Sequence, residues 1–238
     1  MKLGISGVCG KMGMRILHLA NEDPSCDVVV GLESADHPDV GKSQGIAITC
    51  DLKDVEKCEC FIEFTSPQAT LDHLDYFVKY KVPVVIGTTG LKTDEGTMIE
   101  QAAKSIPIVY SPNMSVGVNI LFKLLKDAAA ALSGYSVAIE EAHHIHKKDS
   151  PSGTAKKIAQ VINDQGFSIR TPDISAIREG EIIGDHKVTF ESDVDKIELF
   201  HSAKTRDIFA KGAITAAKWL INKQPGLYSM QNVLFDSN

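Results

Sequence analysis

The stretch from residue 141 to residue 155 carries the side chains best suited to acid–base chemistry. His143, His144, His146 and Lys147 can each hold a carboxylate or take part in proton transfer near neutral pH. The whole chain has a net charge of −6, so this basic stretch is a local exception, and it is too short to follow a phosphate backbone. It therefore predicts a site for a small anionic substrate.

A helix is expected to begin inside the same stretch. Ser152 is a natural N-cap residue, and the backbone amides of Gly153 and Thr154 then fall in the first helical turn. Unpaired amides and the positive end of the helix dipole attract anions. This favours a carboxylate-binding site, and exposed histidines ahead of a capped helix are the plain alternative.

Three histidines within four positions also raise the question of zinc. If the preceding strand continued, His144 and His146 would share one face and His143 would point away. Lys147 would repel a cation, and no carboxylate lies between the histidines. We therefore expect no metal at this segment.

A glycine-rich loop between an expected strand and an expected helix is the second candidate, with the sequence Gly7-Val8-Cys9-Gly10-Lys11-Met12-Gly13. Glycine lets a pyrophosphate approach the backbone, and helix amides then point at it. Glu33 ends the next strand, 20 residues after Gly13, where a carboxylate binds ribose hydroxyls. The pattern predicts a dinucleotide site, with a tight turn that binds no ligand as the alternative.

The choice between NADH and NADPH depends on opposing groups in this loop. Glu33 repels a 2′-phosphate, whereas Lys11 attracts it and Ser34 could donate a hydrogen bond to it. We expect NADH to be slightly preferred and NADPH to be accepted.

Two polar loops follow later strands: Gly87-Thr88-Thr89-Gly90 and Ser111-Pro112-Asn113-Met114. Ligands of parallel sheets bind at the carboxyl ends of the strands, so both loops are candidates for cofactor contact. Their residue types are also those of ordinary turns, which leaves that alternative open.

The elements that must position these groups alternate between strand and helix in the first half. Apolar runs typical of buried parallel strands occur at residues 3–6, 28–32, 60–64, 82–86 and 106–110. Helical patterns separate them at residues 12–20, 67–79 and 93–104. This alternation predicts an α/β fold with a Rossmann-like, doubly wound parallel sheet.

The second half loses the alternation after Asn113. Its patterns predict helices at 116–132 and 152–163, a strand at 135–141, a hairpin at 187–201 and a last helix at 208–221. We expect two domains: a dinucleotide-binding domain of residues 1–113 and 207–238, and an α+β substrate-binding domain of residues 114–206.

The composition excludes several classes of protein. The 238 residues are 43% hydrophobic and 24% charged, which suits a globular core, and no apolar run reaches the roughly 20 residues of a membrane helix. A strand starts within the first residues and leaves no room for a signal peptide, so we expect a cytoplasmic protein. Five cysteines without CxxC spacing indicate reduced thiols, with neither a disulfide framework nor a zinc cluster.

Together these segments resemble the 4-hydroxy-tetrahydrodipicolinate reductase family of lysine and diaminopimelate biosynthesis, formerly called dihydrodipicolinate reductase. The most specific match is Glu141-x-His143-x-x-x-Lys147-x-Asp149-x-Pro151-Ser152-Gly153-Thr154-Ala155. The glycine loop, residues 87–90 and residues 113–119 match in the same order. The resemblance implies an oxidoreductase that moves a hydride from NADH or NADPH to C4 of a cyclic imine dicarboxylate.

By position, the resemblance also implies residue roles. His143 and Lys147 match the catalytic pair, with Lys147 as the proton donor and His143 polarising or protonating the intermediate. His144 matches a substrate contact, and Gly153 and Thr154 match the site for a substrate carboxylate. The implied cofactor contacts are Gly7, Val8, Cys9, Gly10, Lys11, Met12, Glu33, Gly87, Thr88, Thr89, Ser111, Pro112, Asn113 and Met114.

Family members are typically homotetramers joined through sheets of the second domain. The hairpin at 187–201 could serve this, although a monomer could also bury its apolar face. The chain departs from the family at Ala138, at Ser34 and in a short segment at 166–178, which leaves the cofactor preference and the edge of the substrate pocket open.

Two other functions compete with this one. Another two-domain dehydrogenase, acting on a different small dicarboxylate, would share the glycine loop but would not account for the spacing from Lys147 to Thr154. A non-catalytic nucleotide sensor would leave the basic segment without a role.

Overall fold

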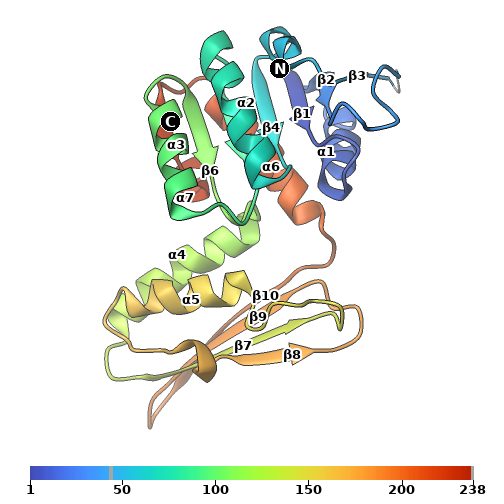
Figure 1. Ribbon diagram of the computed structural model, residues 1–238. Coiled ribbons are helices and arrows are strands. Elements are labelled where there is room, and N and C mark those ends of the chain that lie inside the picture. Colours follow the sequence, from blue (N-terminus) through green and yellow to red (C-terminus); the bar gives the residue numbers. More distant parts are fainter. Residues whose placement is uncertain (43–44, 237–238) are drawn as a thin grey trace. The chain divides into compact units, whose positions relative to one another are not determined.

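The chain divides into two compact units, which the computed structural model describes over residues 1–42 and 45–236 (Figure 1). The first unit contains residues 1–116 and the C-terminal part from residue 209 onward, and the second contains residues 117–208. The boundaries expected from the sequence lie within three residues of these.

The first unit is built on a seven-stranded sheet in which every neighbouring pair is parallel. Across the sheet its strands are β11 (Gly226–Tyr228), β6 (Pro107–Tyr110), β5 (Val84–Ile86), β4 (Cys60–Glu63), β1 (Lys2–Ser6), β2 (Asp27–Leu32) and β3 (Ala47–Thr49). The order 3-2-1-4-5-6 is that of a Rossmann sheet, with its switch point between β1 and β4. The predicted fold class of the first half is confirmed.

Helices bury both faces of this sheet, which is why its strands read as continuous apolar runs. One face packs against α1 (Lys11–Asn21), α6 (Asp207–Leu220) and α7 (Met230–Phe235). The other packs against α2 (Pro67–Tyr80), α3 (Thr93–Ala103) and the 3₁₀ helix η1 (Leu52–Lys57). Leu3 and Ile5 enter the first layer, and Phe61 enters the second.

The second unit is a four-stranded mixed sheet with the order β10-β9-β7-β8. Its strands are β7 (Ser136–His143), β8 (Ser175–Arg178), β9 (Asp185–Glu191) and β10 (Lys196–Ser202), and β7 and β8 run parallel while the other pairs are antiparallel. One face packs its apolar residues against α4 (Val116–Ala131) and α5 (Gly153–Asn163) (Figure 1). The α+β character expected of this half is confirmed, and the predicted hairpin is β9–β10.

Short elements escaped the sequence analysis. Strands β3, β8 and β11 have three or four residues and lie at sheet edges, where the longer apolar run of a central strand is not required. The helix at 208–221 is not the last, because β11 and α7 follow it. A second 3₁₀ helix, η2, spans Thr171–Asp173. Within the described residues, no helix is long and apolar enough to cross a membrane.

Candidate active site

The glycine loop joins β1 to α1 through a backbone that requires glycine at two points. Gly7 has φ of +71°, and a Cβ there would lie 2.6 Å from the carbonyl oxygen of Phe64. A Cβ on Gly13 would lie 2.0 Å from the carbonyl oxygen of Gly7. The start of α1 is therefore packed directly against the loop, at the carboxyl edge of the sheet. Val8 is buried in the core.

Glu33 follows β2 and reaches the glycine loop. Its Oε1 accepts a hydrogen bond from the backbone N–H of Cys9 at 2.8 Å. Lys11, at the first position of α1, is exposed. The structure thus brings the predicted ribose-binding carboxylate next to the predicted pyrophosphate loop.

The 87–90 loop is anchored by a buried polar cluster. Thr88 is buried, and its hydroxyl accepts a hydrogen bond from Thr70 at 2.8 Å. Glu63, fully buried at the end of β4, accepts from the Thr70 hydroxyl at 3.4 Å and lies 2.9 Å from Nδ1 of His73. The side chain of Thr88 therefore fixes the loop, and Thr89 and Gly90 are exposed to solvent.

The 111–114 segment forms a self-bonded turn after β6. The buried hydroxyl of Ser111 donates to the carbonyl oxygen of Asn113 at 2.9 Å, and Oδ1 of Asn113 accepts from the N–H of Ser115 at 2.9 Å. Met114 lies in the core, whereas Pro112 is exposed.

Strand register gathers four polar side chains on one face of the second sheet. Glu141 and His143 are two residues apart on β7 and so share a face. Arg178 on β8 is the register partner of His143, and His186 on β9 is that of Glu141. The rings of His143 and His186 lie 5.3 Å apart between centroids.

Glu141 is the centre of this cluster. Arg178 donates two hydrogen bonds to its carboxylate at 2.7 and 3.0 Å, the N–H of Ser152 donates a third at 3.0 Å, and Nδ1 of His143 is also in contact. Burial acts to raise the pKa of Glu141, but Arg178, the Ser152 amide and His143 together outweigh it and hold the pKa below its usual value. Glu141 is therefore ionised at neutral pH.

His143 is neutral beside it. Burial lowers the pKa of His143, and Lys147 and Arg178 act in the same direction, while Glu141 opposes them. Because an ionised carboxylate only accepts, the single ring proton lies on Nδ1 and Nε2 carries a lone pair. A Cβ on Gly184 would lie 3.0 Å from Nε2, so the glycine keeps this nitrogen uncovered.

Lys147 lies in the loop that follows β7. The strand ends at His143, and the N–H of Lys147 donates to the carbonyl oxygen of His144 at 3.1 Å, so the extended arrangement considered for zinc does not arise. The ammonium of Lys147 lies 2.8 Å from Asp149. His144 lies next to a further cation, with Nε2 3.5 Å from Arg206.

The N-terminus of α5 lies in the same cluster. The predicted N-cap is confirmed, because the Ser152 hydroxyl accepts from the N–H of Ala155 at 3.2 Å. Burial acts to raise the pKa of Asp149, yet Lys147 and the Gly153 amide are among the groups that lower it overall. Lys147, which the resemblance implies to be the proton donor, is thus paired with an internal carboxylate. Thr154 follows Gly153 in the first turn.

Sequence reasoning missed Arg178, His186 and Gly184. Arg178 and Glu141 are 37 residues apart, and β8 was not recognised as a strand. Alternation in β9 was recognised, and pairing it with β7 in register would have found His186.

The family models that match this chain meet near the boundary between its two units. The family model described as dihydrodipicolinate reductase, N-terminus, matches residues 1–114, and the one described as dihydrodipicolinate reductase, C-terminus, matches residues 117–234. The chain belongs to the dihydrodipicolinate reductase family. The resemblance read from the sequence is confirmed, and with it the oxidoreductase class. Family and Rossmann fold together indicate binding of a pyridine nucleotide.

Relatives of this reductase family cover nearly the whole chain. A protein of Syntrophus aciditrophicus (strain SB) named 4-hydroxy-tetrahydrodipicolinate reductase is 41% identical over 98% of both chains, and one of Trichlorobacter lovleyi with the same name is 39% identical over the same shares. The structure titled dipicolinate-bound dihydrodipicolinate reductase from Paenisporosarcina sp. TG-14 has a TM-score of 0.86 and 24% identity, covering 98% of this chain and 99% of its own. The C. glutamicum DAP dehydrogenase in complex with DAP shares the fold at a TM-score of 0.60 and 12% identity, covering 100% of this chain and 96% of its own.

Proposed function

We propose that this member of the dihydrodipicolinate reductase family reduces 4-hydroxy-tetrahydrodipicolinate to tetrahydrodipicolinate in lysine and diaminopimelate biosynthesis. A bound NADH or NADPH supplies the hydride for C4 of the substrate. The family match supports the reaction, and one geometric observation supports the substrate class: the ammonium of Lys147 lies 2.8 Å from the carboxylate of Asp149. A cation that holds this carboxylate suits a carboxylate of the substrate as well.

The first unit holds the dinucleotide in this proposal. The cradle at Gly7 and Gly13 has no room for side chains, and the first-turn amides of α1 suit a pyrophosphate. Glu33 suits ribose hydroxyls and disfavours a 2′-phosphate, so NADH is slightly preferred. The proposed contacts are Gly7, Val8, Cys9, Gly10, Lys11, Met12, Glu33, Gly87, Thr88, Thr89, Ser111, Pro112, Asn113 and Met114, with Val8, Thr88 and Met114 contributing backbone because their side chains are buried.

The second unit holds the substrate and supplies the proton. His144, Gly153 and Thr154 bind the dicarboxylate, and Lys147 donates the proton that follows the hydride. The one N–H of neutral His143 is occupied by Glu141, so its open Nε2 accepts a hydrogen bond from substrate or water. The proton therefore comes from Lys147, and His143 orients the reacting groups.

The experiment is a coupled assay with 4-hydroxy-tetrahydrodipicolinate generated in place from pyruvate and aspartate semialdehyde by the preceding synthase. Oxidation of NADH and NADPH is followed separately. Lys147→Ala should retain NADH binding and lose at least 100-fold in kcat, in keeping with loss of a general acid. Lys148→Ala, the exposed neighbouring lysine, is the matched control and should turn over normally. Unchanged turnover in Lys147→Ala would refute the role of Lys147, and no oxidation of either nucleotide would refute the reaction.

A homotetramer is part of the same proposal. The sheet face opposite α4 and α5 exposes Phe200 by 62% and Ile177 by 43%, around Asp185 and Lys187. Large apolar side chains on an open sheet face suit burial against another copy of the chain. A cytoplasmic setting also stays a prediction.

A further inference from the structure

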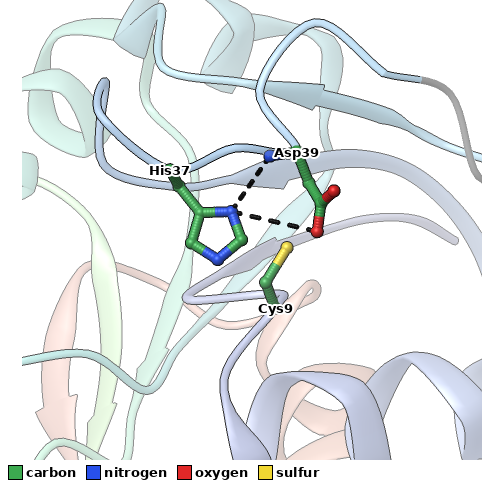
Figure 2. A group of neighbouring side chains, drawn as sticks. All are labelled: Cys9, His37 and Asp39. Carbon is green, nitrogen blue, oxygen red and sulfur yellow. Dashed lines mark hydrogen bonds and ion pairs between the residues drawn. The ribbon is translucent and has the colours of Figure 1, made fainter.

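The loop after β2 brings two side chains to the glycine loop. His37 and Asp39 lie beside Cys9, and one ligand atom from each of the three lies within 4.8 Å of the others (Figure 2). All three residues are partly buried. The loop is held in this shape by its own backbone, since the N–H of His37 donates to Ser34 at 2.9 Å and the N–H of Val40 donates to His37 at 3.1 Å.

Each of the three groups presents a donor atom toward the others. Nδ1 of His37 accepts from the N–H of Asp39 at 3.3 Å, so this nitrogen carries a lone pair, which a cation would bind in exchange for that hydrogen bond. Oδ1 of Asp39 accepts a hydrogen bond from the ammonium of Lys42 at 2.8 Å, while its Oδ2 lies 4.0 Å from Nδ1 of His37. Figure 2 shows the sulfur of Cys9 beside this carboxylate and the ring.

A sulfur, an imidazole nitrogen and a carboxylate oxygen form a ligand set that suits Zn²⁺, with water as the fourth ligand. Zinc bonds of about 2.0–2.3 Å in a tetrahedron separate ligand atoms by roughly 3.3–3.8 Å. The observed span of 4.8 Å therefore needs a contraction of roughly 1 Å, within reach of side-chain rotation. We propose that Cys9, His37 and Asp39 bind a divalent cation of the zinc class, and that this cation antagonises dinucleotide binding at the glycine loop.

The antagonism rests on the proposed function, because it requires the dinucleotide to occupy the same loop. Cys9 is the third residue of that loop, and its N–H is bonded to Glu33, the proposed ribose ligand. Drawing the thiolate toward His37 would displace this N–H and the carboxylate that depends on it. A cation on Cys9 would also attract the carboxylate of Glu33, which is bonded to the Cys9 N–H, and so compete with ribose hydroxyls for it.

Cys9 would coordinate the cation as a thiolate, so binding releases the thiol proton to solvent.

The test of the site uses Co²⁺ alone, titrated into reduced protein without nucleotide. A thiolate-to-cobalt charge-transfer band in the near ultraviolet is expected, lost in Cys9→Ser and requiring at least tenfold more Co²⁺ in His37→Gln. The exposed thiol of Cys50 provides the matched control, and Cys50→Ser should leave the band unchanged. Absence of the band, or its survival in Cys9→Ser, would overturn the site.

The test of the antagonism measures NADH affinity by calorimetry with and without Zn²⁺. The Kd for NADH should rise at least tenfold with Zn²⁺, and this rise should vanish in His37→Gln. Equal affinities alongside a positive cobalt result would overturn the antagonism. Failure of the metal-free protein to bind NADH would instead count against the proposed function, and the cobalt result would still decide the site.

Discussion

Replacing Arg178 with methionine should destabilise the second unit, because it leaves the buried carboxylate of Glu141 without its main partner. Two charge-assisted hydrogen bonds of 2.7 and 3.0 Å are lost, while Glu141 stays inaccessible to water at 1% exposure. Removing one partner of a buried ion pair costs about 3–5 kcal/mol. Since the Arg178 side chain is 18% exposed, we expect about 3 kcal/mol, near the lower end of that range.

Hydrogen exchange of the β7 amides, followed by mass spectrometry at pH 7, measures the loss in the free energy of unfolding of the second unit. A loss of about 3 kcal/mol corresponds to exchange faster by roughly 100-fold or more. The double variant Glu141→Gln with Arg178→Met should recover part of the loss, because the uncompensated charge is gone.

A second arginine–carboxylate pair has similar distances but is exposed, and it serves as the control for burial. Arg170 holds Asp173 through two bonds of 2.8 and 3.0 Å, but its side chain is 79% exposed. Arg170→Met should leave exchange of the β7 amides unchanged, since exposed pairs contribute little. If Arg178→Met behaved like Arg170→Met, burial would not be what gives the Glu141 pair its strength.

Three further outcomes are expected. Burial lowers the pKa of His186 from 6.5 to about 4, so the unfolded chain binds more protons between these values and the free energy of unfolding decreases as the pH is lowered from 6.5 to 4. A shift of about 2.5 units at about 1.4 kcal/mol each corresponds to a loss of roughly 3 kcal/mol. In urea titrations the wild type should lose most of this between pH 7 and pH 4.5 and His186→Gln should not; an equal loss in both would show that the ring is already protonated in the folded protein. Gly184→Ala should push the ring of His143 away and lower kcat at least tenfold, whereas Gly96→Ala, with open space around its Cβ, should not change kcat; equal rates in steady-state assays would contradict the role of the open Nε2. Phe200→Glu should reduce the particle mass seen by light scattering from tetramer to a smaller species, and an unchanged mass would place the interface elsewhere.

The first unit was largely predictable because its information is local. Each strand buried on both faces reads as an apolar run, and the helices between them show their period. The glycine loop was found in the same way, since Gly7 and Gly13 are fixed by contacts within a few residues and with the adjoining strand end. Edge strands such as β3 and β11 are short and are not flanked by strands on both sides, so they lack the apolar run that marks the central strands.

The second unit was predictable only in part, because its site depends on which strands pair and in which register. His143 and Lys147 stand out in one segment, but Arg178 enters through the β7–β8 pairing and His186 through β7–β9. The neutral state of His143 likewise follows from burial and from neighbours distant in sequence, none of which spacing along the chain reveals.

The first unit is discontinuous in the chain, and this has a consequence for its synthesis. One layer of its core takes Ala213, Ala217, Leu220, Met230 and Val233 from the C-terminal part, and β11 covers the outer edge of β6. A ribosome delivers these residues only after the whole second unit. Until then the nascent sheet has an unpaired edge and an apolar face covered only by α1, the kind of surface that chaperones bind and that other chains can pair with. Emergence of β11 and α7, more than emergence of the glycine loop, sets the moment at which the nucleotide-binding unit can close.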